Sequence, residues 1–418
     1  MNLADKMTLL QTTWNIEGSS YAKEINAKIA LGEVHGDENL KGPEPADNRN
    51  ELAPLILSLL KKANKENTTP AFRAMFPPAY APFVHIIQEQ GQCIENLCYI
   101  NYNKIAFVIG TAYEKRKAYT LTNSSIQELP ATIQSIGRSH QNEIYAIAEE
   151  STVTTYKGWQ GKKIAAFKVP IANYLAVSQV IPFNDGLSVL LISPEGIYLL
   201  TTNGHSLIHP APDAEDDEWT PEIDMEHAAL SYDNSFIVAG DQNSAHRILN
   251  RNGRELAVID ALSSYPHYAL FSKDGQQAIL NSCHSYNGIS ISVPANNWQA
   301  LSTGARKEGP PYTVIDKTGR VYAAVSASGY YILGDASGFI KAFDNKGKYL
   351  WQHFLGSTIS SMAMSDDEKT LWVASCSGMI HKLTLNGGRR DDHTIGNGDH
   401  YEEFRIIFWK NEPQPLVW

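Results

Sequence analysis

Apolar and polar residues alternate in short runs along most of this chain, and turn residues separate the runs. The pattern is clearest in residues 229–240, where two apolar runs flank a Ser-Tyr-Asp-Asn-Ser turn. Residues 270–280 and 362–375 repeat the same arrangement. Alternation with period two, interrupted by turn residues, is typical of antiparallel hairpins. Because the copies recur about every 40 to 50 residues, the sequence predicts a series of stacked sheet modules.

Seven such modules are predicted along the chain. Each starts with a short apolar strand, followed by a turn and a second strand, and the first strands begin near Cys93, Thr132, Ala176, His227, His267, Val321 and Ile359. Seven four-stranded antiparallel modules form a β-propeller, in which radial stacking leaves only short, protected sheet edges. We therefore predict an all-β fold, a seven-bladed β-propeller of four-stranded blades over residues 91–418.

Two of the repeats resemble those of a known superfamily. The turn Ser272-Lys273-Asp274-Gly275 resembles the Ser-Pro-Asp-Gly turn of WD40-like and YVTN-like propellers, and residues 334–344 are similar to a quinoprotein-type repeat. The resemblance covers residues 91–410 and implies the propeller fold. The Gly-His and Trp-Asp signatures of strict WD40 repeats do not occur in the sequence, so the resemblance implies no particular activity. A pair of β-sandwiches is the alternative fold, and it would require the regular spacing to be coincidental.

The two ends of the chain differ from the middle. Residues 1–90 are predicted to form an N-terminal extension, with a helix at residues 51–62 whose lysines lie at its C-terminal end, as the helix dipole favours. We expect this helix to cap the propeller. Residues 404–409 are strongly strand-forming and are predicted to supply the outer strand of the last blade, because the first blade has four strands of its own.

Composition narrows the class of protein further. The hydrophobic fraction of 43% is enough for a large core, and no stretch reaches the roughly 18 apolar residues of a membrane helix. The N-terminus lacks a basic region followed by an apolar one, so no secretory signal is expected. Four cysteines are too few for a disulfide framework. We expect reduced, buried thiols in a bacterial cytoplasmic protein, with Cys93 and Cys98 near each other across a turn.

Negative charge is concentrated in one stretch. The formal net charge of −10 disfavours nucleic acid as a ligand, because neutralising phosphates requires a surplus of Lys and Arg. Residues 211–226, called the acidic segment below, contain no Lys or Arg and eight carboxylates: Asp213, Glu215, Asp216, Asp217, Glu218, Glu222, Asp224 and Glu226. This connection between two modules is longer than a turn requires, and long loops in compact folds are usually functional or disordered.

Catalytic motifs are few. The sequence has no Gly-x-Ser-x-Gly nucleophile elbow, no phosphate-binding Gly-Lys-Ser/Thr and no CxxC pair. Ionisable residues near the predicted strand ends do not recur at equivalent positions of the modules: Glu226, His227, His267 and Asp316. We therefore predict no catalytic residue, no cofactor and no metal. The enzymatic alternative is a lactonase-like hydrolase with a divalent metal at the propeller axis.

Binding is the function that the sequence favours. Trp219 lies among the carboxylates of the acidic segment, and an aromatic anchor surrounded by charge is typical of an interface hot spot for a basic partner. The predicted partner-binding residues are Asp213, Glu215, Asp216, Asp217, Glu218, Trp219, Glu222 and Asp224. The alternative is a solvated loop with Trp219 folded back on a blade. Residues 305–311 and 389–403 are two further candidate surfaces. We expect a stoichiometric inhibitor or immunity-type protein that neutralises one toxin or effector, or alternatively a general assembly scaffold.

Overall fold

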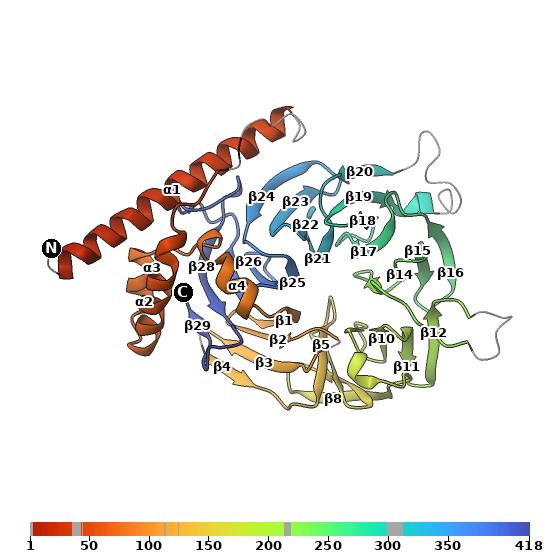
Figure 1. Cartoon of the computed structure of the whole chain (residues 1–418). Coiled ribbons are helices and arrows are strands. Elements are labelled where there is room, and N and C mark those ends of the chain that lie inside the picture. Colours follow the sequence, from red (N-terminus) through yellow and green to blue (C-terminus); the bar gives the residue numbers. More distant parts are fainter. Residues whose placement is uncertain are drawn as a thin grey trace.

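Seven antiparallel sheets form a ring in the computed structural model, which describes residues 3–35, 43, 45–112, 114–123, 125–212, 219–298 and 312–418, with the side chains of residues 3, 4 and 33–35 left out (Figure 1). Six sheets have four strands and the seventh has five. In every sheet the strands lie side by side in sequence order, with the first strand innermost. The predicted all-β, seven-bladed propeller with a partly helical N-terminal extension is therefore confirmed.

The first four blades span residues 94–259. The first consists of β1 (Ile94–Asn101), β2 (Lys104–Ile109), β3 (Lys117–Thr122) and β4 (Ser125–Glu128). The second consists of β5 (Ile133–Arg138), β6 (Ile144–Glu149), β7 (Thr152–Lys157) and β8 (Lys162–Lys168). The third consists of β9 (Gln179–Pro182), β10 (Ser188–Ser193), β11 (Gly196–Thr201) and β12 (Gly204–His209). The fourth consists of β13 (His227–Leu230), β14 (Phe236–Gly240), β15 (His246–Asn250) and β16 (Glu255–Ile259).

The other three blades span residues 265–417. The fifth consists of β17 (Tyr265–Phe271), β18 (Gln277–His284), β19 (Asn287–Pro294) and β20 (Thr313–Asp316). The sixth consists of β21 (Val321–Ala327), β22 (Tyr330–Asp335), β23 (Phe339–Asp344) and β24 (Tyr349–Phe354). The seventh consists of β25 (Ile359–Met364), β26 (Thr370–Ser375), β27 (Met379–Thr384), β28 (Tyr401–Ile407) and β29 (Leu416–Val417). We call the face on which the innermost strands begin the strand-start face, and the opposite one the strand-end face.

A repeated Ser-x-Asp turn explains why the sequence pattern recurs. In three blades the serine Oγ donates to the aspartate Oδ1: Ser231–Asp233 (2.8 Å), Ser272–Asp274 (2.6 Å) and Ser365–Asp367 (2.6 Å). Each serine oxygen also accepts a hydrogen bond, at 2.9 Å, from the backbone N–H five residues later. The residue after each aspartate has a positive φ: Asn234 (61°), Gly275 (70°) and Glu368 (59°). These polar residues shape the hairpin between the first and second strands of a blade.

A disulfide spans the junction where the ring closes. The first and seventh blades exchange no strand, and β1 packs directly against β25. Cys93, just before β1, is bonded to Cys376, just after β26. The expectation of four reduced thiols was therefore wrong for this pair, whereas Cys98 and Cys283 are free and buried. The two partners lie 283 residues apart in sequence, so only closure of the ring brings them together.

Replacing Cys93 by serine is expected to weaken the closed ring. A crosslink over such a long loop restricts the unfolded chain strongly, so we expect its loss to lower the free energy of unfolding by about 2–5 kcal/mol. Guanidinium unfolding with and without dithiothreitol measures the effect. Reductant should lower the midpoint of the wild type and leave that of the variant unchanged. Equal midpoints for all four samples would show that the disulfide does not stabilise the ring.

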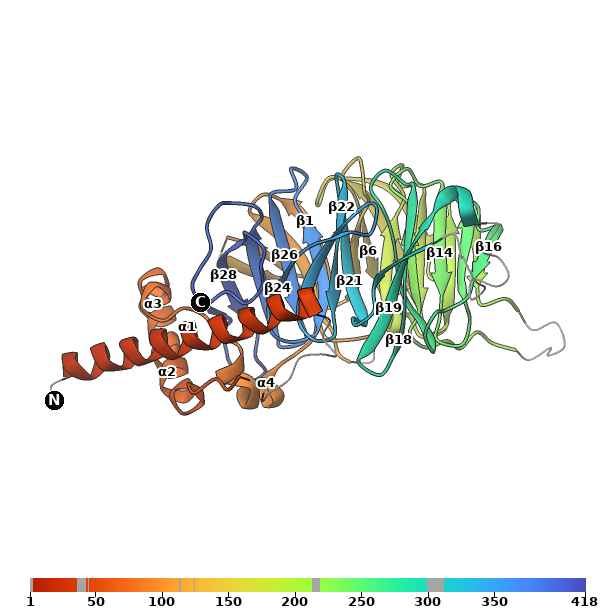
Figure 2. The same cartoon turned by 90° about the horizontal axis from the view of Figure 1, so that it is seen from above.

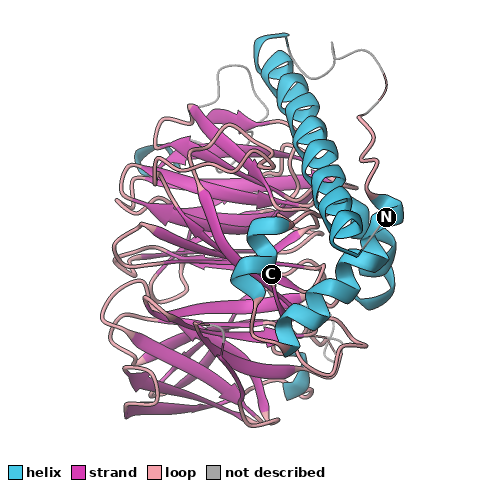
Figure 3. Ribbon diagram, turned by 90° about the vertical axis from the view of Figure 1, so that its left-hand side faces the viewer, coloured by secondary structure: helices cyan, strands magenta, loops and turns pink. Residues whose placement is uncertain are grey.

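Four helices form the N-terminal extension and lie beside the seventh blade (Figures 2 and 3). They are α1 (Leu3–His35), α2 (Ala53–Lys65), α3 (Thr69–Met75) and α4 (Val84–Gln90). The helix predicted at residues 51–62 is confirmed as α2, which follows a 3-10 turn at Asn50–Leu52. The long α1 was not predicted, because small and polar residues such as Gly18 and Ser20 interrupt its apolar pattern.

The extension and the C-terminal strands share a hydrophobic core. Trp14 of α1, Leu60 of α2 and Phe83 pack in one buried cluster with Ile407 of β28 and Trp418. Residues 404–407 lie in β28, the fourth strand of the last blade as the prediction required, but β29 adds a fifth strand outside it, so β28 is not the outermost strand. The helices therefore cover the outer edge of the seventh blade, with α4 leading into β1 on the strand-start face (Figure 2).

Candidate functional site: the channel mouth on the strand-start face

The described ends of the acidic segment, residues 211–212 and 219–226, follow β12 and precede β13, and they therefore lie on the strand-start face. Five of its predicted partner-binding residues lie outside the described residues: Asp213, Glu215, Asp216, Asp217 and Glu218. Of the other three, Trp219 is half-buried, and Glu222 and Asp224 are exposed. Two backbone hydrogen bonds hold this end of the segment in place, one from the Ile223 N–H to the Pro194 carbonyl oxygen (2.8 Å) and one from the Gln242 N–H to the Asp224 carbonyl oxygen (2.9 Å).

The acidic segment ends at the mouth of the central channel. The seven innermost strands surround a cavity of about 740 Å³, and residues 224–227 contribute to its lining. Met225 has a positive φ of 56°, and its neighbours Asp224 and Glu226 both line the channel. The exposed carboxylate of Glu222 and the carboxyl groups at the mouth thus belong to one continuous stretch of chain.

Two half-buried carboxyl groups, those of Glu95 and Glu226, and one arginine occupy this mouth. The Arg116 side chain has no exposed surface, donates to two backbone carbonyl oxygens, and lies 3.3 Å from Glu95 Oε2. Glu226 accepts a hydrogen bond from the Ser178 hydroxyl. Burial raises the pKa of both carboxyl groups, and the neighbouring Glu226 raises the pKa of Glu95 further while Arg116 opposes the shift. The mouth therefore offers carboxyl groups that a second cation would stabilise in their charged form.

Buried histidines form the wall behind these carboxyl groups. His227 Nε2 lies 3.1 Å from His246 Nδ1, and His267 Nδ1 donates to the Val321 carbonyl oxygen at 2.7 Å. His267 Nε2 is therefore the acceptor for Arg320, whose Nη2 is 3.0 Å away. Burial lowers the pKa of His227 to about 4 and of His267 to about 3. Both imidazoles are thus neutral at physiological pH.

Side chains cross the channel near the strand-end face. The contacts join blades that are not neighbours, namely the second and seventh, the fifth and seventh, and the second and fourth. They are the ion pair of Arg138 with Asp366 (2.8 and 3.0 Å), that of Lys273 with Glu368, and the hydrogen bond between His140 Nε2 and the Leu230 carbonyl oxygen (2.8 Å). These contacts link non-adjacent blades on the strand-end side of the ring.

Several of the ionisable residues that lie in separate modules of the sequence come to the same place in the structure. Glu226, His227 and His267 line the same mouth, although they are not at equivalent positions of their blades. Asp316 belongs to the outer strand β20 and pairs instead with Lys341 of the next blade, at 3.2 Å. Within the described part of the chain, no three His, Cys, Asp or Glu side chains converge closely enough to hold a metal ion.

Sequence reasoning missed three further residues of the mouth: Glu95, Arg116 and Arg320. A signal existed for Glu95, since it is the one charged residue of β1, the innermost strand of the first blade. Arg116 and Arg320 precede β3 and β21 in short connections on the strand-start face, where exposed arginines are ordinary. Arg116 and Arg320 reach the channel mouth because the blades close into a ring, and the residues next to them in the sequence do not indicate this position.

No described helix combines the length and the apolar character needed to cross a membrane. Comparisons with models of known protein families and with curated proteins give no match for this chain, so its likeness to other proteins rests on the propeller fold alone.

Proposed function

We propose that this propeller is a non-catalytic binding protein that holds a basic protein partner on its strand-start face. In the form we favour, it is a bacterial, cytoplasmic, stoichiometric inhibitor or immunity-type protein, and the partner is the toxin or effector that it neutralises. The observation that carries the proposal is the continuity between the acidic segment and the carboxyl groups of the channel mouth. A basic protein surface bound at the channel mouth would lie against the carboxyl groups of Glu222, Asp224 and Glu226.

The charge distribution supports a basic partner. Eight carboxylates in 16 residues account for most of the net charge of −10. Such a local field speeds encounter with an oppositely charged protein and disfavours wrong partners. Trp219, half-buried beside this charge, has the size and rigidity of a hot-spot residue. A basic side chain placed in the mouth would also add a second cation beside Glu95 and Glu226, next to that of Arg116.

The sequence left two alternatives to this proposal, a lactonase-like hydrolase with a divalent metal at the axis and a general assembly scaffold. Affinity capture from native lysate, with mass spectrometry and metal analysis on the same sample, separates the possibilities. One stoichiometric basic partner supports the inhibitor, several partners support the general scaffold, and a bound divalent ion without a partner supports the hydrolase. Thiol trapping in cells tests the compartment, because a reducing cytoplasm would keep Cys93 and Cys376 as thiols.

Reversing one charge of the acidic segment is expected to slow association. Glu222→Lys should reduce the association rate constant for the captured partner by about two- to fivefold and weaken its salt dependence. Stopped-flow measurements between low and physiological salt report both quantities. Glu143→Lys is the matched control, because Glu143 is an exposed carboxylate on the strand-end face. Equal effects of the two variants would show that the acidic segment is not the interface.

A further inference from the structure

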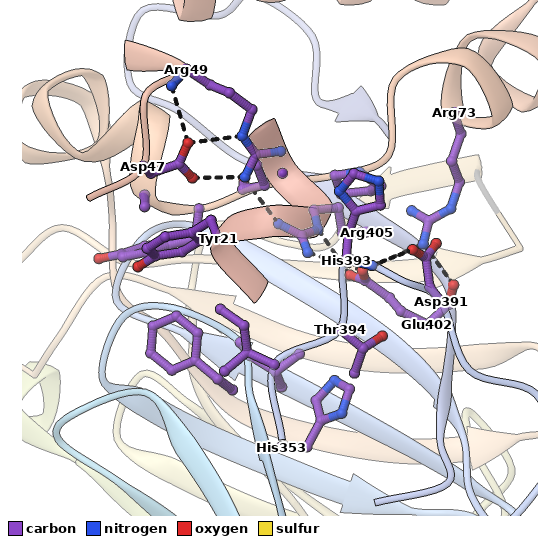
Figure 4. A pocket seen from close by; sticks show the side chains of 18 residues that line it. Tyr21, Asp47, Arg49, Arg73, His353, Asp391, His393, Thr394, Glu402 and Arg405 are labelled. Atoms are coloured by element: carbon purple, nitrogen blue, oxygen red, sulfur yellow. Dashed lines mark hydrogen bonds and ion pairs between the residues drawn. The ribbon is translucent and has the colours of Figure 1, made fainter. Parts of the chain in front are cut away.

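A second, smaller cavity lies between the N-terminal extension and the seventh blade (Figure 4). Its volume is about 70 Å³, enough for several water molecules or one small polyatomic ion. Its walls come from α1, from the segment around Arg49, from the end of β24 and from residues 391–395. The last of these belongs to the third candidate surface that the sequence indicated, residues 389–403.

One arginine in this pocket has an unused donor. Arg49 is 4% exposed, and its Nε and Nη2 atoms donate to the Asp47 carboxylate at 2.8 and 2.7 Å. Its guanidinium group lies over the Trp14 ring, 4.6 Å from the ring centre. The remaining nitrogen, Nη1, is buried and has no partner in the structure. Because a guanidinium group can only donate, Nη1 requires an acceptor.

Two histidines have unpartnered nitrogen atoms in the same pocket. A Cβ atom on Gly18 would lie 2.3 Å from Arg49 Nη1 and 2.5 Å from His393 Nδ1, so these two nitrogens approach the same point of α1 and are less than about 5 Å apart. His393 Nδ1 and His353 Nδ1 are both buried without a partner. Three nitrogens from three separate segments thus line one polar cavity, and buried polar groups normally find partners.

The charged side chains that line the pocket balance one another in number. They are three carboxylates, Asp47, Asp391 and Glu402, and three arginines, Arg49, Arg73 and Arg405. Arg49 pairs with Asp47, while Arg73 and Arg405 both pair with Glu402 (Figure 4). Outside the lining, Arg390 donates to the carbonyl oxygens of Thr394 and Gly396, and the Asp392 carboxylate acts on His393. The pocket is therefore distinguished by its unpartnered nitrogen atoms and not by an excess of positive charge.

We propose that this pocket binds a small oxyanion, a phosphate or carboxylate group, between the N-terminal extension and the seventh blade. The oxyanion accepts hydrogen bonds from Arg49 Nη1 and from imidazole N–H groups of His393 and His353. Charge-assisted bonds of this kind are about twice as strong as neutral ones. Because Arg49 belongs to the extension and both histidines belong to the propeller, the ligand joins the two parts. This inference does not depend on the proposed partner.

Titration calorimetry on the full chain tests the proposal, with inorganic phosphate and acetate as probes at constant ionic strength. We expect saturable one-site binding of at least one of them. His393→Ala and Arg49→Lys should each weaken it about tenfold, since each removes one donor while Arg49→Lys keeps the charge beside Asp47. His85→Ala, an exposed histidine on α4, is the matched control and should bind like the wild type.

The outcome also identifies the source of the oxyanion. Binding of phosphate alone assigns a phosphate group, binding of acetate alone assigns a carboxylate, and binding of both assigns a general oxyanion site. If neither phosphate nor acetate binds saturably, the proposal is overturned, and the pocket holds only water. Binding that His393→Ala and Arg49→Lys leave unchanged would equally overturn it, because the anion would then lie elsewhere. Circular dichroism of both variants shows whether they are folded.

Discussion

Replacement of Trp418 by alanine is expected to lower the free energy of unfolding by about 3–5 kcal/mol and to loosen the N-terminal extension. Trp418 is 2% exposed, and its ring lies 5.3 Å from that of Phe83, 6.0 Å from Phe72 and 6.3 Å from Trp14. Its indole N–H donates to the Phe76 carbonyl oxygen at 2.8 Å. Truncation thus removes the aromatic contact shared by three helical segments and leaves a cavity among them.

Guanidinium unfolding and limited proteolysis measure this effect. The extension of the Trp418→Ala variant should be cleaved faster than that of the wild type, whereas the blades should resist. Trp219→Ala is the matched control, since it removes an equally large side chain that is only half-buried. Main-chain hydrogen bonds between Trp418 and Arg405 should persist in the variant, because they do not involve the side chain. Equal destabilisation by both substitutions would contradict the central role of Trp418.

Acidification below about pH 6 is expected to destabilise the protein strongly. Burial lowers the pKa of His227 to about 4 and that of His353 to about 3, both from the ordinary value of 6.5. Between pH 6.5 and these values, the two histidines are protonated in the unfolded chain but neutral in the folded protein. The free energy of unfolding therefore falls as the pH drops through this range. A shift of this size amounts to about 3 kcal/mol for His227 alone. Protonation of Glu95 and Glu226, whose pKa values are raised, acts in the opposite direction.

The midpoint of guanidinium unfolding, measured from pH 8 to 4.5, tests this expectation. His227→Gln removes one of the titrating groups and should reduce the slope of stability against pH. His85→Gln replaces an exposed histidine and should keep the slope of the wild type. A midpoint that stays constant between pH 7 and 5 would mean that the buried histidines bind protons as readily in the folded state as in the unfolded chain.

The fold could be predicted because its signals are local. Each Ser-x-Asp turn, such as Ser272 with Asp274, forms from residues close in sequence and repeats from blade to blade. The α2 helix could also be predicted from a local signal, since its apolar residues recur at helical spacing within one short stretch. In α1, by contrast, the face against the propeller includes Trp14, Gly18 and Ala22, so small residues form part of the contact and the helix lacks a regular apolar stripe.

The candidate site could be predicted only in part. The acidic segment was visible as a run of like charge, and the structure describes Trp219, Glu222 and Asp224 of the predicted contact residues. Residues 305–311, a second candidate surface, lie outside the described residues. Glu95 and Glu226 come together only because the ring brings the first and fourth blades to one axis. Contacts of this kind depend on tertiary closure, which no local pattern encodes.

The packing of the helices against β28 and β29 has a consequence for synthesis of the chain. The helices leave the ribosome more than 300 residues before the strands that cover their apolar faces. At ordinary elongation rates of about 5–20 residues per second, this interval lasts roughly 15–60 s. During that time Trp14 and its neighbours in the extension lack the contacts that Ile407 and Trp418 supply, although blades can already form behind them. Strands β28 and β29 are thus the segments whose synthesis completes the burial of the helices and ends their exposure to chaperones and to aggregation.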